Sequence, residues 1–335
     1  MDSIVQCALC DGQSELIIEK KEREFRKEKF IVSEHYYKCN NCKQDFTTAE
    51  LDEIDTLQVY NQYREKYKIL FPSQIKSLRE KFGLSAPKMS EILGFGINVY
   101  KNYEKGEVPN QSNATLLNLV QSPEEFKKVV EIKRGLFEES EYNRLMYNLN
   151  SLIENKSECQ SEINTLWNEE AIPNEFTGYS TPSFEKFANM VIFFLSIAQF
   201  KVKLNKLLYY ADFLNYKYNG CSISGSKYQA IKMGPIVFRY GSNFDLLQEN
   251  GYIDTEMVLV MDEYHDKFIK IKDFDEGVFN KEELDVLYRT YDTLKVFSTE
   301  ELKEMSHKET GWINENISKG LISYQKYGFD LNVNL

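Results

Sequence analysis

The pattern of apolar and polar positions divides this chain into segments that predict different elements. In residues 15–38, aromatic and β-branched residues stand among many charged ones, and this composition predicts antiparallel strands with a charged outer face. Residues 50–70 instead place apolar residues at helical spacing, which predicts a connecting helix. The chain therefore begins with a small β-rich segment, followed by a helix.

Residues 72–120 carry the start and stop signals of a compact helical unit. Pro72 is a favoured first residue for one helix, and Ser85 is a favoured cap for the next, which ends at the turn 94–96. A third helix is predicted from Ile97 to Lys105, and a fourth follows. Residues 78–110 have the length and turn chemistry of a helix-turn-helix.

A second body begins at residue 183, with two apolar helices predicted over 183–199 and 201–220. Between the two bodies the chain is acidic, and we interpret this stretch as a solvated face and a partly extended linker. The later elements predicted are a strand at 227–231, a break at Gly234–Pro235, a helix at 236–249, a hairpin of 258–261 with 268–271, and helices at 281–294 and 298–306.

Composition narrows the class of protein. The chain has 335 residues with a formal net charge of −11, so any contact with DNA must come from a locally basic face. We see no signal peptide, and the longest apolar run, residues 190–198, is too short to span a bilayer. We therefore expect a cytoplasmic protein without a membrane partner, and a reducing compartment favours metal binding over disulfides.

Two CxxC pairs are the most specific chemical signal. Cys7 with Cys10 and Cys39 with Cys42 can supply four thiolates to one tetrahedral Zn²⁺ site. Such a site leaves no open position, so its role is structural. The alternative, a redox dithiol, lacks a thioredoxin-like βαβ context. The other two cysteines, Cys159 and Cys221, are expected to be buried apolar residues.

The predicted third helix carries the candidate DNA contacts. Asn98 and Asn102 are one helical turn apart, and asparagine can pair bidentately with adenine. Residues 73–105 contain six basic and three acidic residues, so this stretch is positive. The alternative is a plain helical bundle with solvated side chains. The candidate contacts to the DNA backbone are Ser85, Lys88, Lys101 and Lys105.

These motifs together resemble the MqsA/YgiT family of antitoxins. The resemblance covers about residues 5–125 and rests on CALC…CNNC and on GFGINVYKNYEKGEVPN. It implies a zinc-binding N-terminal domain, followed by an Xre-like domain that binds DNA and dimerises. By position, Asn98 matches the family's base-reading asparagine, whereas Asn102 replaces its DNA-contacting arginine.

The C-terminal body resembles the Panacea, or SocA-like, domain over about residues 184–325. The resemblance rests on KLNKLLYYA, on the GPIV turn and on the closing segment LYRTYDTLKVFSTEELKEMSHKETGW. It implies that a toxin is neutralised by direct binding, and one relative is a proteolytic adaptor. Residues 201–239 hold seven basic residues and only Asp212. A partner-contact surface is predicted at Tyr216, Tyr218, Tyr228, Arg239 and Tyr240, although such tyrosines also commonly cover the edge of a core.

The expected fold is therefore multi-domain and mainly α with small β elements. It combines a zinc-ribbon-like domain, a helix-turn-helix bundle and a C-terminal helical domain with a short β hairpin. The expected boundaries are 1–50 for the zinc-binding domain, 51–70 for the connecting helix, 71–135 for the helix-turn-helix domain, 136–182 for a helical and acidic linker and 183–335 for the Panacea domain.

Three functions are compatible with these features. The first is the antitoxin of a type II toxin–antitoxin system, a homodimer that binds a cognate toxin and autoregulates at operator DNA. The second is a transcriptional regulator with a protein-sensing C-terminal domain, and the third is a proteolytic adaptor. An enzyme is disfavoured because the sequence has no HExxH, GxSxG, P-loop or GxGxxG motif and only three histidines.

Overall fold

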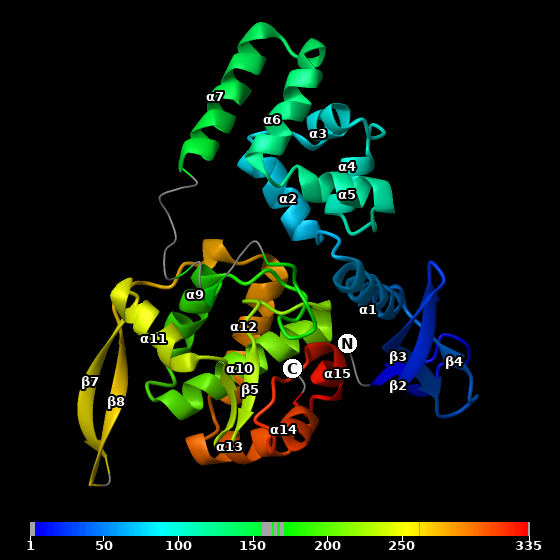
Figure 1. Ribbon diagram of the computed structural model, residues 1–335. Helices are drawn as coiled ribbons and strands as arrows, with labels where there is room; N and C mark the ends of the chain where they lie inside the picture. The colour runs from blue at the N-terminus through cyan, green and yellow to red at the C-terminus, as the bar shows by residue number, and fades with distance from the viewer. Residues whose placement is uncertain (1–3, 156–162, 164–165, 168–170, 261, 334–335) are drawn as a thin grey trace. The chain divides into compact units, whose positions relative to one another are not determined.

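The computed structural model describes residues 4–155, 163, 166–167, 171–260 and 262–333. It divides into two compact units (Figure 1): Met1–Gln62 together with Pro173–Leu335, and Tyr63–Ile172. Both are mainly helical, and the strands form small antiparallel sheets, as the sequence predicted. Among the described helices, none has both the length and the apolar character needed to cross a membrane.

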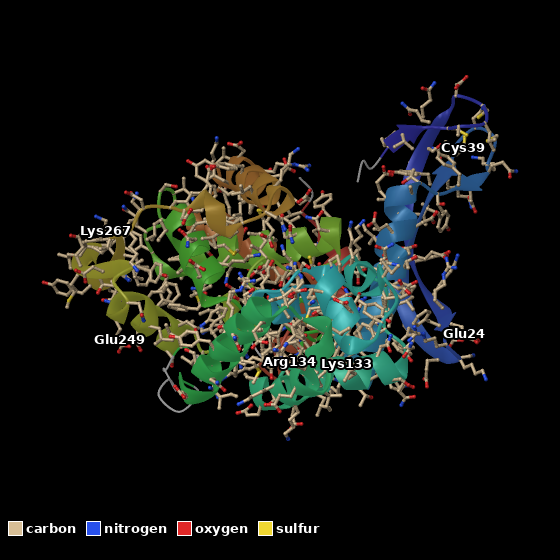
Figure 2. The ribbon with its side chains drawn as sticks, turned by 90° about the horizontal axis from the view of Figure 1, so that it is seen from above. Glu24, Cys39, Lys133, Arg134, Glu249 and Lys267 are labelled. Atoms are coloured by element: carbon tan, nitrogen blue, oxygen red, sulfur yellow. The ribbon has the colours of Figure 1, made fainter. Side chains whose placement is uncertain are left out.

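The N-terminal sheet is a long hairpin with a short strand at each edge. Its strands, in sheet order, are β1 (Ile4–Gln6), β2 (Gln13–Phe25), β3 (Glu28–Cys39) and β4 (Asp45–Phe46). β2 pairs with β3 from Ser14↔Cys39 to Phe25↔Glu28, so the predicted antiparallel hairpin is confirmed. Cys39 and Glu24 lie at opposite ends of this hairpin (Figure 2).

Helix α1 (Ala49–Tyr67) lies along the edge of β3 that β4 leaves unpaired, and its side chains bond to backbone groups there. Gln58 accepts from the Ser33 N–H through Oε1 and donates to the Ser33 carbonyl through Nε2, both at 2.8 Å. The His35 N–H donates to Asp55 Oδ2 at 2.9 Å. These bonds occupy backbone groups of β3, which fixes the helix on the sheet.

The second unit is a bundle of helices around one apolar core. The stacked rings of Phe82 and Phe126, 4.2 Å apart, lie inside it. Leu145 and Leu149 reach the same core, so residues 139–155 of the expected linker form a core helix, and part of the remaining linker lies outside the described residues. The elements are α2 (Pro72–Lys81), α3 (Ala86–Leu93), α4 (Val99–Glu104), α5 (Gln111–Leu119), α6 (Pro123–Ile132), η1 (Arg134–Leu136) and α7 (Glu139–Asn155).

The C-terminal body is built around α10 (Lys201–Asn219), which is buried continuously from Leu204 to Lys217. Asp212 on α10 accepts bonds from the N–H groups of Ile223 and Ser224, and so holds the following loop. The other elements are α9 (Phe184–Phe194), β5 (Tyr228–Ile231), β6 (Gly234–Val237), α11 (Tyr240–Glu249), β7 (Ile253–Val260), β8 (Glu263–Lys270), η2 (Glu276–Val278), α12 (Lys281–Leu294), α13 (Thr299–His307), α14 (Thr310–Glu315), α15 (Tyr324–Tyr327) and η3 (Gly328–Asp330).

Two local predictions for this body are wrong. Gly234–Pro235 is part of strand β6, where Pro235 pairs with Ala230, rather than a break. Proline is accepted because β6 belongs to a two-stranded ladder and so has a free edge. The following helix begins at Tyr240 instead of residue 236, since 234–237 pair with β5.

The N-terminal sheet of β1–β4, called the ribbon below, and helix α1 belong to the same unit as the C-terminal body, because polar and apolar contacts join them. Gln325 Nε2 donates to Gln58 Oε1 at 3.1 Å, and Lys20 Nζ donates to the Lys326 carbonyl at 3.2 Å. Gly220 ends α10 with φ of 70°, and a Cβ there would come within 2.6 Å of Leu57 on α1. Glycine is therefore favoured at this junction by its positive φ, whereas the close Leu57 methyl group is the end of a flexible side chain.

Candidate metal centre and DNA-binding helix

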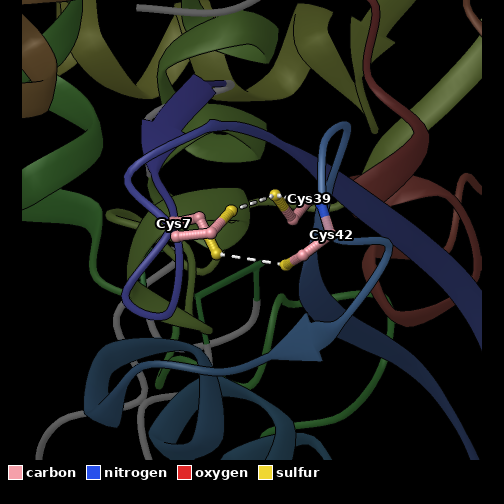
Figure 3. Close-up of side chains that lie close together, drawn as sticks. Cys7, Cys39 and Cys42 are labelled. Carbon is pink, nitrogen blue, oxygen red and sulfur yellow. Dashed lines mark hydrogen bonds between the residues drawn. The ribbon is translucent and has the colours of Figure 1, made fainter.

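The four cysteines of the CxxC pairs form one cluster (Figure 3). Their sulfur atoms all lie within 4.8 Å of one another, with Cys7 and Cys42 at 3.7 Å and Cys10 and Cys39 at 3.5 Å. Cys7 and Cys39 are 1% and 0% exposed, and the other two are half-buried. The donor set and its spacing fit a metal ion held by four sulfurs.

The two halves of the cluster are built by equivalent backbone turns. The Cys7 N–H donates to the Gly12 carbonyl at 2.7 Å, and the Cys39 N–H donates to the Gln44 carbonyl at 3.0 Å. A Cβ at Gly12 would lie 2.8 Å from Asn41 Cβ, so glycine allows the two turns to approach closely. In both turns the residue after the second cysteine, Asp11 or Lys43, has positive φ.

Two thiols of the cluster, those of Cys39 and Cys42, differ in how readily they ionise. Burial opposes ionisation of Cys39, but the N–H groups of Cys42 and Asn41 donate to its sulfur and lower its pKa to about 6. The Gln44 N–H lowers the pKa of Cys42, but burial and the neighbouring thiols outweigh it and raise that pKa to about 12. A cation is therefore needed for all four groups to be thiolates together.

Helix α4 presents a polar face and buries an aromatic one. Asn98, Lys101, Asn102 and Lys105 are all exposed. On the opposite side Tyr100 is 0% exposed and donates through its hydroxyl to the Ile75 carbonyl at 2.7 Å. Burial raises the pKa of Tyr100, so this hydroxyl remains a hydrogen-bond donor. The orientation of the polar face is thus set by the core of the unit.

A second contact fixes α4 against the first helix of this bundle. Arg79 Nε on α2 donates to Glu104 Oε1 at 2.6 Å, and Arg79 also donates to the Leu84 carbonyl at 3.0 Å. Glu104 raises the pKa of Arg79, so the guanidinium is charged. Sequence reasoning counted Arg79 only as part of the basic stretch, because the partner lies on another helix.

Ser85 and Lys88 have internal partners in α3. Ser85 is the N-cap, and its hydroxyl accepts from the Lys88 N–H at 3.3 Å. Lys88 Nζ donates to the Leu136 carbonyl at 2.7 Å, lies 3.3 Å from Glu141 and is over the Phe137 ring at 4.4 Å. The Lys88 side chain is only 17% exposed, so a phosphate contact by Lys88 stays a prediction and would require its ammonium to leave these internal partners.

The tyrosines predicted as a contact surface do not share one face. Tyr216 and Tyr228 are 0% exposed, and their hydroxyls donate to Gln325 and Asp212 at 2.8 Å, so the expectation that they are exposed is wrong. They are buried because α10 and β5 form the centre of the body. Tyr218 and Tyr240 are half-buried, and only Arg239 is exposed.

Two features of the C-terminal body were not found from the sequence. Lys206 is 2% exposed, and its Nζ donates to the Pro235 carbonyl at 2.7 Å, where burial and then Lys303 lower its pKa to about 7. The second feature is a group of exposed apolar residues on the β7–β8 hairpin. Cys221 is half-buried rather than fully buried, and burial of its thiol raises its pKa to about 11, whereas Cys159 lies outside the described residues.

Comparison with protein families places both regions among antitoxins. Residues 5–130 match the model for the antitoxin component of bacterial toxin-antitoxin systems, MqsA, and residues 204–313 match that for the antitoxin SocA-like, Panacea domain. The fusion of these two modules in one chain is confirmed, and it supports an antitoxin role. A comparison with curated proteins finds no match.

Proposed function

We propose that this chain is the antitoxin of a type II toxin–antitoxin pair, with toxin binding in the C-terminal body and operator binding in the helix-turn-helix unit. The observation that carries the proposal is the presence of two antitoxin modules, at residues 5–130 and 204–313, in one chain. The role is one of binding rather than catalysis, and both partners would be macromolecules, namely a cognate toxin and DNA.

The DNA-binding part of the proposal rests on α4. Its exposed Asn98 and Asn102 offer amide groups to base edges in a major groove, and Lys101 and Lys105 offer ammonium groups to phosphates. Ile97, just before α4, is 85% exposed and suits contact with a thymine methyl group. A homodimer through this unit would present two such helices about 34 Å apart, one turn of DNA.

We assign Zn²⁺ as the metal of the four-cysteine cluster. Four thiolates at about 2.3 Å from a tetrahedral zinc ion are about 3.8 Å from one another, and the observed pairs at 3.7 and 3.5 Å are close to this spacing. With four protein ligands the ion has no open position, so its role is to hold the two turns together.

The deciding experiment uses the protein encoded by the adjacent reading frame. Expressed alone it should arrest growth, and co-expression of this chain should restore growth and give a complex that co-purifies. Binding of this chain to DNA upstream of its own gene is measured in parallel. Operator binding without toxicity or complex formation would favour a regulator that senses another protein.

A further inference from the structure

The β7–β8 hairpin projects from the helices of the C-terminal body (Figure 1), and among its described residues the buried side chains lie at its base. There Ile253 and Phe268 are 2% and 4% exposed, and the Phe268 ring stacks on Phe244 with centroids 4.7 Å apart. The Phe268 N–H also donates to the Gln199 carbonyl at 2.9 Å. Lys267, next to Phe268 on β8, is labelled at the margin of the body in Figure 2.

The face that is buried at the base continues as an apolar face at the tip. Side chains alternate along a strand, so Ile253, Met257 and Leu259 lie on one face, and directly paired residues share a face. Leu259 pairs with Tyr264, and Met257 pairs with Asp266. Met257, Leu259 and Tyr264 are 72%, 60% and 71% exposed. This apolar group, Met257, Leu259 and Tyr264, is called the tip patch below.

The folding of the hairpin does not account for the tip patch. A two-stranded hairpin gains little stability from apolar groups that remain in water, and polar residues at these positions would keep the register of β7 and β8. Clustered exposed apolar groups on an unpaired sheet mark interaction sites or aggregation hazards. Tyrosine and methionine are also enriched at the centres of protein interfaces.

Charge decides between the possible occupants of the tip patch. Residues 253–270 contain five acidic and two basic residues, a formal charge of −3. Both lysines are already paired, Lys267 with Glu256 at 2.6 Å and Lys270 with Asp273 at 3.0 Å. A second copy of the hairpin, an anionic membrane and a nucleic acid would all be repelled. A protein with an apolar patch bordered by lysine or arginine would be attracted.

We propose that the tip patch, with Asp266 beside it, is the docking surface for the toxin, and that the matching surface of the toxin is apolar with a basic border. This inference rests on the proposed antitoxin function and specifies where the partner binds. The four predicted contact tyrosines are a separate group of residues, two of them in the core.

The test compares full-length variants for binding to the protein encoded by the adjacent reading frame, by titration calorimetry. The triple variant Met257→Ser, Leu259→Ser, Tyr264→Ser should weaken binding by about 100-fold or more, the effect of losing interface anchor residues. The matched control, Val260→Ser with His265→Ser, changes the opposite face of the hairpin and should bind as the wild type does. All variants should keep the wild-type melting temperature.

A charge variant keeps the proposal testable if the triple variant folds poorly. Asp266→Lys changes one exposed side chain and should slow association and reduce its dependence on salt. Binding of both variants within threefold of the wild type would overturn the docking surface while leaving the antitoxin function standing. If the wild type itself does not bind, both proposals fail. A dimer of this chain that only the triple variant abolishes would assign the tip patch to a second copy and overturn the proposal.

Discussion

The ring of His35 meets the ring of Phe329 edge-on, with centroids 4.8 Å apart and planes inclined by 68°. His35 lies on β3, four residues before Cys39 of the four-cysteine cluster, and Phe329 lies in η3 near the other end of the chain. Asp55 on α1 orients His35, since Nδ1 of the ring donates to Asp55 Oδ1 at 2.6 Å. The contact therefore links the ribbon, α1 and the C-terminal body within one compact unit.

Replacing Phe329 with alanine should destabilise both sides of this contact. The side chain is 2% exposed and also packs against Tyr216, so the free energy of unfolding should fall by about 3 kcal/mol. Hydrogen exchange should become faster in β3 as well as in α15. The matched control is Ile317→Ala, at a position that is 93% exposed. Unchanged exchange in β3 would show that the ribbon folds independently of the C-terminal body.

Removal of the metal should loosen the ribbon. Either a chelator or Cys39→Ser should speed hydrogen exchange at the ends of β2 and β3 that adjoin the cluster, because the sulfurs then no longer share a metal ion that holds the two turns together. Metal content, measured by mass spectrometry, should fall from one ion per chain to none. Cys221→Ser, a control outside the cluster, should leave the metal content unchanged.

Variants of α4 should weaken DNA binding without changing stability. Asn98→Ala should reduce discrimination between operator and unrelated DNA by about 1–3 kcal/mol, the usual worth of a bidentate base contact. Lys101→Met should instead lower the affinity for all DNA sequences. It should also reduce the slope of the salt dependence by the amount expected for the loss of about one phosphate contact. Fluorescence anisotropy at several salt concentrations separates the two effects. Asn143→Ala, at an exposed position on α7, is the control.

Lys88 should behave differently from Lys101 although both are lysines of the helix-turn-helix. Lys88→Met removes the bond to the Leu136 carbonyl and should lower the free energy of unfolding by about 1–2 kcal/mol, with little change in the salt dependence of DNA binding. Urea denaturation measures the first effect, with the exposed Lys128→Met as its control. A reduced salt dependence would instead identify Lys88 as a phosphate contact.

The stability of the chain should increase with pH because of Lys206. Its pKa is about 7 in the folded protein, where burial and Lys303 disfavour the charge, and about 10.4 when unfolded. Between these values the unfolded chain binds more protons, so the free energy of unfolding should rise, by up to about 2 kcal/mol from pH 7.5 to 9.5. His307, also near Lys206, titrates below this window because burial lowers its pKa. Lys206→Met should abolish the rise.

Short-range sequence patterns predicted the caps and turns of this protein correctly. They failed for a helix that is buried on every side, because its apolar residues do not recur with the helical period. The caps at Ser85 and Ser298 and the two CxxC turns are local, so the sequence alone locates them correctly. α10 is buried on all sides, and a helix of this kind shows no polar stripe to separate inner from outer residues. Tyr216 was therefore expected on the surface, although its hydroxyl has a partner 109 residues away, Gln325.

The sequence by itself determined which residues can hold a metal, where the helix-turn-helix begins and which two antitoxin families the chain resembles. Residue spacing is enough for these features, because a CxxC turn or a capped helix forms from neighbouring residues. Only the tertiary structure decided which side chains are free to act. It gave Lys88 internal partners, left Lys101 exposed and placed Met257 at the tip of a hairpin. Exposure depends on distant segments that pack together, and no local pattern of residues records that packing.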